Sequence, residues 1–202
     1  AVACERAEGV IPCPGVVPGS GPIGDAIAHG AELVSELDFA FSFCSRPIIA
    51  VTGTNGKTTT TELIAAMVRA CGCSVALAGN NACPFSEAVM ESPQADYFVL
   101  EISSYQLETT LHFHPKVGAI LNVTPDHLAR HTTIEQYAAT KAKLFARQAK
   151  DEFSIVNADD PVSAPLTDAG RGRALSFSLA RAVPAGLWVE GEVIREGDVE
   201  VA

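Results

Sequence analysis

The sequence predicts an α/β protein with a mostly parallel sheet, helices on both faces of that sheet, and a small antiparallel β appendage. Two observations support this. Short, nearly continuous apolar runs alternate with amphipathic segments over residues 48–157, as in strands that are buried on both faces of a parallel sheet. The run at 48–51 stops at Gly-Thr-Asn-Gly, followed by a lysine and four threonines, which predicts a strand, a phosphate-binding loop and a helix.

The first 46 residues are the least regular part of the chain. Proline and glycine are interleaved over much of this segment, and no run is long enough to form a full hydrophobic layer. We expect a short helix at 24–30 and a short strand at 32–34. We interpret residues 1–46 as the remnant of a preceding domain, and we expect residues 47–202 to form a second domain.

From residue 47 onwards the predicted strands and helices alternate. We distinguish strands from helices by the pattern of apolar residues. A continuous apolar run predicts a buried strand, and apolar residues every three or four positions predict a helix. The expected strands are 48–51, 74–78, 97–101, 117–123 and 153–157, and the expected helices are 58–71, 85–91 and 133–149. Parallel sheets bind ligands at the carboxyl ends of their strands, so the residues that follow each strand are the first candidates for a site.

After Pro161 the pattern changes to short alternations of apolar and polar residues. These cover 174–179 and 187–201, and the second stretch contains Gly191 and Gly197. Such alternation, interrupted by glycine turns, predicts antiparallel hairpins from about residue 174.

Composition limits the possible partners and the compartment. Lys plus Arg total 14 against 24 for Asp plus Glu, a net charge of −10, which disfavours a nucleic-acid partner. No apolar run approaches the roughly 20 residues of a membrane span, and the N-terminus does not resemble a signal peptide. We therefore expect a monomer in the cytoplasm with no membrane partner. The six cysteines lack paired metal-ligand spacing and are expected to be reduced structural thiols.

The Gly-Thr-Asn-Gly-Lys-Thr stretch carries the most specific chemistry. Gly53 and Gly56 allow backbone angles that point amide groups at an anion, at the positive end of a helix. Lys57 adds a mobile positive charge, and Thr58 a hydroxyl suited to magnesium. The match to the general phosphate-loop pattern is partial, because Val51 stands where a glycine is usual.

Two further residues follow predicted strands. Glu101 is placed to hold the magnesium of a nucleotide; the alternative is a strand-end glutamate that accepts from nearby backbone amides. His127, in Thr-Pro-Asp-His, can ligate a metal or donate to an oxyanion, although a lone loop histidine is usually only solvated. We expect His112, His114 and His131 to be surface histidines.

Lys141 falls on the apolar face of the helix expected at 133–149, together with Tyr137, Leu144 and Phe145. A buried amine costs free energy unless it is paired or chemically altered. The alternative is a side chain whose stem covers the core while its ammonium reaches water.

These motifs together resemble the Mur ligase family. The matching stretches, in chain order, are TGTNGKTT at 52–59, Gly79-Asn80, EISSYQLE at 101–108, LNVTPDH at 121–127, YAATKAKLF at 137–145 and VNADD at 156–160. The resemblance implies a P-loop NTPase-like central domain. It also implies an ATP-dependent, ADP-forming amide ligase of peptidoglycan precursor synthesis that acts through an acyl phosphate. The run at 101–108 is most similar to the member that joins D-glutamate to UDP-N-acetylmuramoyl-L-alanine.

The resemblance also implies roles for individual residues, with ATP and Mg²⁺ as cofactors. Catalytic roles fall to Lys57, His127 and Lys141, and Lys141 matches a family lysine that is carbamylated. Metal ligation falls to Thr58, Glu101, His127 and the modified Lys141. Nucleotide binding is implied for Gly53, Thr54, Asn55, Gly56, Lys57, Thr58 and Thr59, and substrate contacts for Asn80, Ser103 and Gln106.

Asn81 and Ala82 replace the family's usual Ile-Gly, which predicts a substrate loop of different shape. Since the family has three domains, we expect a C-terminal domain to be absent from these 202 residues and the fragment alone not to complete the reaction. Two alternatives remain. One is another Mur ligase or a folylpolyglutamate-synthetase-like ligase, and the other is a nucleotide-binding module without catalysis.

Overall fold

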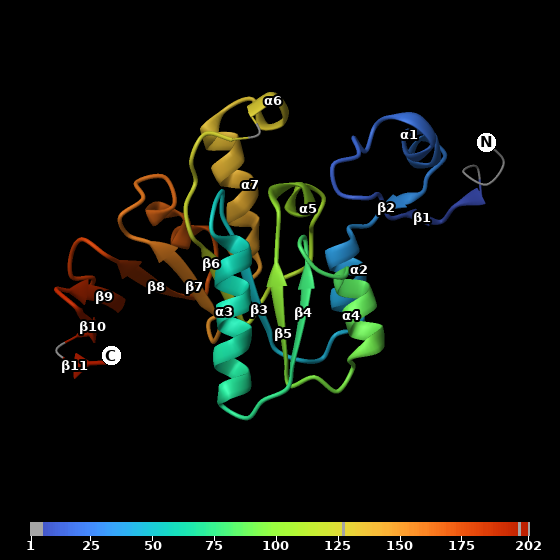
Figure 1. Cartoon of the computed structure of the whole chain (residues 1–202). Helices are drawn as coiled ribbons and strands as arrows, with labels where there is room; N and C mark the ends of the chain where they lie inside the picture. Colours follow the sequence, from blue (N-terminus) through green and yellow to red (C-terminus); the bar gives the residue numbers. More distant parts are fainter. Residues whose placement is uncertain (1–5, 127, 198, 202) are drawn as a thin grey trace.

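The computed structural model describes residues 6–126, 128–197 and 199–201. Within these residues one large sheet organises the molecule (Figure 1). Its strands are β3 (Ile48–Thr52), β4 (Val75–Gly79), β5 (Tyr97–Glu101), β6 (Val117–Ile120), β7 (Phe153–Asn157), β8 (Arg173–Ser178), β9 (Gly186–Glu190), β10 (Val193–Glu196) and β11 (Val199–Glu200). Their spatial order is β11-β10-β9-β8-β7-β6-β3-β5-β4.

The strands from β4 across to β9 pair in parallel, which confirms the predicted sheet type. The five strands predicted between residues 48 and 157 are all present, although β6 ends at Ile120 rather than at residue 123. In the register, Glu101 of β5 lies opposite both Val51 of β3 and Gly79 of β4. The carboxyl ends of these three strands therefore lie level at one edge of the sheet.

Helices cover both faces of the sheet. The helices are α2 (Glu36–Phe43), α3 (Lys57–Ala70), α4 (Phe85–Glu91), α5 (Ser104–Glu108), α6 (Leu128–His131), α7 (Ile134–Ala146) and the 3-10 helix η2 (Ala164–Ala169). Phe98 and Leu100 of β5 belong to one core cluster with residues of α2, α4 and α7. Val99 lies between them in the strand and is also fully buried, but it points to the opposite face of the sheet. That face is covered by α3, whose fully buried Ala65 likewise lies outside the core cluster.

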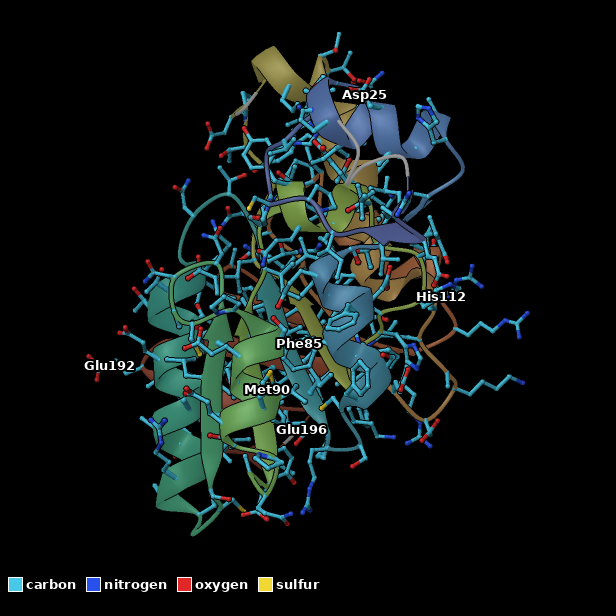
Figure 2. All side chains as sticks on the ribbon, turned by 90° about the vertical axis from the view of Figure 1, so that its right-hand side faces the viewer. Asp25, Phe85, Met90, His112, Glu192 and Glu196 are labelled. Atoms are coloured by element: carbon cyan, nitrogen blue, oxygen red, sulfur yellow. The ribbon has the colours of Figure 1, made fainter. Side chains whose placement is uncertain are left out.

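The N-terminal segment is divided between two environments. β1 (Gly9–Val10) and β2 (Glu32–Leu33) form a separate parallel pair beside α1 (Gly21–Ala28), close to the short helix and strand predicted there. α2, by contrast, packs against α4, and its Leu37 and Ala40 are 1% exposed within the main core. Figure 2 looks at this side of the molecule. The core of the sheet therefore extends into residues that precede the predicted boundary at 46/47.

The C-terminal strands correct one prediction. β8 was expected in an antiparallel hairpin from about residue 174, but it is parallel to both β7 and β9. The reason is that η2 lies between β7 and β8 and carries the chain back to the starting edge, as a parallel connection requires. Antiparallel pairing is confirmed for β9, β10 and β11, which continue the same sheet.

In the described part of the chain no helix has the length and apolar character needed to cross a membrane. The cysteines that the structure describes are free thiols, and Cys13 and Cys71 are exposed.

Candidate active site

The phosphate loop joins β3 to α3 and is shaped by two glycines. Gly56 is the N-cap residue of α3 with φ 84°, a conformation that side chains strongly disfavour. Lys57 bends back over the loop, and its Nζ donates to the carbonyl oxygens of Gly53 (3.2 Å) and Thr54 (3.0 Å). A cation thus lies beside the N-terminus of a 14-residue helix, and both features attract an anion.

The loop that follows β6 holds the phosphate loop in place. Oδ1 of Asn122 accepts from the N–H groups of Thr54 (3.1 Å) and Asn55 (2.9 Å), and its Nδ2 donates to the Asn55 carbonyl (3.0 Å). The Thr124 N–H donates to Thr54 Oγ1 (3.0 Å). The strand-end rule selects Asn122 and the 124–127 loop as candidates, but no role for Asn122 or Thr124 was predicted from the sequence. The available signal was the place of Asn122 near the carboxyl end of a strand.

Glu101 is the centre of a buried polar cluster at the same edge. It is 4% exposed, Thr58 Oγ1 donates to its Oε2 (2.6 Å), and Asn80 Nδ2 donates to its Oε1 (2.9 Å). The carboxylate thus accepts hydrogen bonds from the side chains of Thr58 and Asn80. In the alternative interpretation, its partners would have been nearby backbone amides. Gly79 makes this approach possible, because a Cβ there would lie 2.1 Å from the Glu101 carbonyl oxygen.

The oxygens of Thr58 and Glu101 fit a magnesium ion. Mg²⁺ prefers hard oxygen ligands, and in nucleotide sites it takes one or two carboxylates and completes its shell with phosphates and water. Within the described residues no group of three or more His, Cys, Asp or Glu side chains gathers.

Lys141 is buried, as its helical position predicts. It is 1% exposed, its Nζ donates to the Gly53 carbonyl (3.0 Å), and it lies 4.4 Å from the centre of the Tyr137 ring. Burial and, to a lesser extent, the charge of Lys57 lower the pKa of Lys141 to about 7, although the charge of Asp126 acts in the opposite direction. A substantial fraction of Lys141 is therefore a neutral amine near neutral pH.

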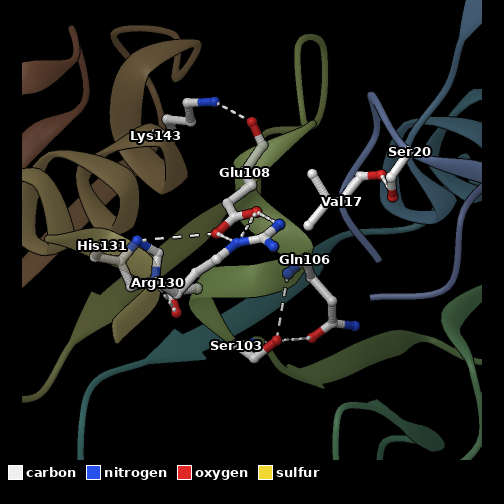
Figure 3. Close-up of polar contacts among 9 residues, drawn as sticks. Val17, Ser20, Ser103, Gln106, Glu108, Arg130, His131 and Lys143 are labelled. Atoms are coloured by element: carbon white, nitrogen blue, oxygen red, sulfur yellow. Dashed lines mark hydrogen bonds and ion pairs between the residues drawn. The ribbon is translucent and has the colours of Figure 1, made fainter. Parts of the chain in front are cut away.

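The predicted substrate residues divide between two settings. Asn80 belongs to the Glu101 cluster, whereas Ser103 and Gln106 form a capping box at the start of α5 (Figure 3). Oε1 of Gln106 accepts from the Ser103 N–H (2.9 Å) and hydroxyl (3.0 Å). Asn80 and Gln106 also line a cleft, together with residues 12–14 and Glu36 of the N-terminal segment. The N-terminal segment thus faces the sheet edge across this cleft.

The remaining predicted nucleotide residues follow the loop. Thr54 is 9% exposed, whereas Asn55, Gly56 and Thr59 face outwards. His127 lies outside the described residues. His112 is exposed, as expected.

The expectation of a surface position is wrong for His131, which is 5% exposed. Its Nε2 is 3.0 Å from Ser104 Oγ, and its ring packs against Tyr105 and Tyr137. These partners come from α5 and α7. The prediction considered only that His131 lies near other histidines in the chain, which gives no information about these contacts.

A glycine loop that opens a helix, a lysine within it, and a hydroxyl–carboxylate pair at the carboxyl edge of a parallel sheet define a nucleotide-binding domain of the P-loop type. Comparison with known proteins gives the family. The model for the Mur ligase middle domain matches residues 51–197, and the chain belongs to the Mur ligase family.

Curated proteins similar to this chain carry the name of a ligase. A UDP-N-acetylmuramoylalanine–D-glutamate ligase of Pelotomaculum thermopropionicum is 43% identical over 190 residues, which is 94% of this chain and 42% of that protein. One of the same name from Thermoanaerobacter pseudethanolicus is 42% identical over 198 residues, 98% of this chain and 42% of that protein. The chain therefore spans less than half the length of these relatives.

Solved structures show the same fold. A UDP-N-acetylmuramoyl-L-alanyl-D-glutamate–2,6-diaminopimelate ligase matches with a TM-score of 0.60 and 25% identity, covering 82% of this chain and 44% of that one. E. coli FolC, in complex with DHPP and ADP, also matches with a TM-score of 0.60, at 13% identity and over 82% of this chain and 50% of that one. The chain thus shares its fold with both of these proteins.

Proposed function

We propose that this chain is the ATP-binding part of a ligase that joins D-glutamate to UDP-N-acetylmuramoyl-L-alanine. The observation that carries the proposal is the cluster of Thr58, Glu101 and Asn80 beside the phosphate loop. Relatives of that name are about 40% identical over most of the chain, which favours this substrate pair over that of the more distant FolC-like ligases. Monomeric state, the assignment of residues 1–46 to a substrate domain and a cytoplasmic location remain predictions.

The reaction needs a carboxylate to become an electrophile. A carboxylate oxygen of the UDP-linked L-alanine attacks the γ-phosphorus of ATP, the β–γ bond breaks, and ADP leaves. The amine of D-glutamate then attacks the acyl carbon, loses a proton, and expels phosphate. Lys57 neutralises charge on the phosphates, and Thr58 and Glu101 would hold Mg²⁺, which supplies further positive charge when bound. His127 is proposed to bind a second magnesium ion.

Lys141 is proposed to carry a carbamate. In this modification the neutral amine nitrogen bonds to the carbon of carbon dioxide and gives up a proton, and the product bears one negative charge. The lowered pKa of Lys141 supports the proposal because only the neutral amine is nucleophilic. A carbamate would turn an inward-facing cation into an oxygen ligand of the kind that magnesium prefers.

The cleft beside Asn80 and Gln106 is the proposed place of the UDP-sugar. Its walls come from the N-terminal segment and from the carboxyl edge of the sheet, so a ligand there would reach towards Glu101. Asn80 is proposed to contact both the metal cluster and this substrate, whereas Ser103 and Gln106 also shape the turn into α5.

Calorimetric titration tests the proposal in two stages. The chain is titrated first with a non-hydrolysable ATP analogue and magnesium, then with UDP-N-acetylmuramoyl-L-alanine. Glu101→Gln should weaken magnesium-dependent binding by about tenfold or more. The control Glu87→Gln removes an exposed charge on α4 and should have no effect. Binding of the analogue without the UDP-sugar would refute the substrate assignment, and binding of a pterin instead would favour the folylpolyglutamate-type alternative. Binding of neither nucleotide would refute the proposal as a whole.

A further inference from the structure

An ion pair outside the predicted site joins α5 to α6. The carboxylate of Glu108, the last residue of α5, accepts from the Arg130 guanidinium, with Nε 3.0 Å from Oε1 and Nη2 2.6 Å from Oε2 (Figure 3). Both side chains are about four-fifths buried, at 21% and 23% exposure. A two-point contact of this kind fixes orientation as well as distance, and it raises the pKa of Arg130.

The same two helices are joined again at His131. Its Nε2 is 3.0 Å from Ser104 Oγ, its Nδ1 is 3.9 Å from Glu108 Oε1, and its ring is stacked on Tyr105. Lys143 of α7 donates to the Glu108 carbonyl oxygen. α6 is only four residues long, so these contacts, rather than its own hydrogen bonds, hold it in place.

Ser104, His131 and Glu108 have the order of a hydrolytic triad, but their surroundings do not suit one. Ser104 is 3% exposed, which denies a substrate access to its hydroxyl. The Glu108 oxygens are bound by Arg130, and their distance from Nδ1 exceeds that of a hydrogen bond. The group is therefore better suited to holding two helices together than to nucleophilic attack.

This connection bears on the phosphate site through the chain on either side of it. α5 starts three residues after Glu101, whose carboxylate is bonded to Thr58. The segment before α6 is attached at its other end to the phosphate loop, through Asn122 and Thr124. Asn122 and Thr124 are thus tied to the phosphate loop, and Arg130 and His131 of α6 are tied to the β5–α5 unit.

We propose that Glu108 is a positioning residue for the magnesium–nucleotide site, and that its ion pair with Arg130 holds α6 in register with the β5–α5 unit that carries Glu101. The inference rests on the proposed function, since it assumes that this edge binds a metal–nucleotide complex. The contacts of Glu108 in the described part of the chain are with Arg130, His131 and Lys143, so its effect on the phosphate site is indirect.

The test is the magnesium dependence of nucleotide binding by this chain. A non-hydrolysable ATP analogue is titrated at a series of magnesium concentrations, and the magnesium concentration for half-maximal binding is measured. Glu108→Gln should raise that concentration about tenfold, as expected for a residue that acts on metal ligands indirectly, and leave magnesium-free binding within about twofold. The control Glu190→Gln breaks the Arg195 ion pair between β9 and β10 and should change neither value.

Two further variants keep the outcome decisive. Arg130→Lys retains the charge without the two-point contact and should show the same selective change if Glu108→Gln does not fold. The double variant Glu108→Arg with Arg130→Glu should restore part of the magnesium affinity. Equal weakening with and without magnesium, or no change at all, would overturn the positioning role. Absence of nucleotide binding by the unaltered chain would instead overturn the proposed function.

Discussion

The buried amine of Lys141 gives a prediction about stability that does not depend on activity. In the folded chain its pKa is about 7, against an ordinary value of 10.5, mainly because burial disfavours the charged form. Between these values the unfolded chain binds more protons at this residue than the folded chain does. The free energy of unfolding should therefore rise with pH in the window from about pH 7 to pH 10.5, and Lys141→Met should lack this contribution.

The magnitude follows from the width of the window. Each pH unit inside it changes the contribution by about 1.4 kcal/mol, so from pH 7.5 to pH 9.5 Lys141 should add about 3 kcal/mol to the unfolding free energy. Because Lys141 is 1% exposed, solvent screening reduces this little. Methionine has a similar length, so Lys141→Met should keep the packing against Tyr137.

Urea denaturation at pH 7.5, 8.5 and 9.5 in carbonate-free buffer measures the effect for both proteins. Other groups that titrate in this range, such as the thiols, are common to both and cancel in the difference. The difference in unfolding free energy between the unaltered chain and Lys141→Met should move in favour of the unaltered chain as pH rises. Parallel pH profiles would show that the amine is solvated or paired and would refute the reasoning.

Three other substitutions test the geometry. Gly79→Ala should lower the unfolding free energy in urea by about 2 kcal/mol or more, because the new Cβ meets the Glu101 carbonyl; a smaller loss would refute the close approach. Asp38→Asn should cost about 2 kcal/mol at pH 7, since its carboxylate accepts from three N–H groups of 111–113. Burial raises the pKa of Asp38, but these donors lower it overall, so its stabilisation should fade as pH falls below about 4; an unchanged acid profile in the variant would contradict this. Lys57→Ala should weaken binding of the ATP analogue at least about tenfold while circular dichroism stays unchanged, and retained affinity would exclude a phosphate role.

The parts of the fold that sequence predicts well are those set by local pattern. The apolar runs of β3, β5 and β7 were found because a strand covered on both faces must be apolar along its length. The burial of Lys141 followed from helical spacing, which places it on the same face as Tyr137 and Leu144. The edge at which Glu101 lies followed from strand direction alone.

The parts that were missed depend on distant partners. The direction of β8 is set by the path of η2, whereas its own alternating residues suit either pairing. His131 is buried against Ser104 and Tyr105 of α5, which lie far away in sequence, as well as against the nearby Tyr137. The capping box of Ser103 and Gln106 is an exception, because the Ser-x-x-Gln spacing is a local signal of a helix start that the prediction from sequence did not use. Local pattern thus predicts layers, while long-range packing decides which polar groups meet.

The N-terminal segment supplies the last test, because the structure places its core boundary earlier than the sequence suggests. β1 and β2 pair only with each other among the described strands, whereas Leu37 and Ala40 of α2 are in the main core. A chain that starts at residue 35 should therefore fold cooperatively and bind the ATP analogue as well as the unaltered chain. A chain that starts at residue 47 loses α2 and the Asp38 carboxylate, and should be less stable by at least about 4 kcal/mol.

Urea denaturation and calorimetry distinguish the two truncations. Both remove 12–14 and so one wall of the cleft beside Asn80, and both should bind a UDP-sugar more weakly than the unaltered chain. Only the shorter chain should lose stability, because only it exposes the surface that α2 covers on α4. Equal stability of the two truncated chains would mean that α2 is an appendage, and the boundary predicted at 46/47 would then hold.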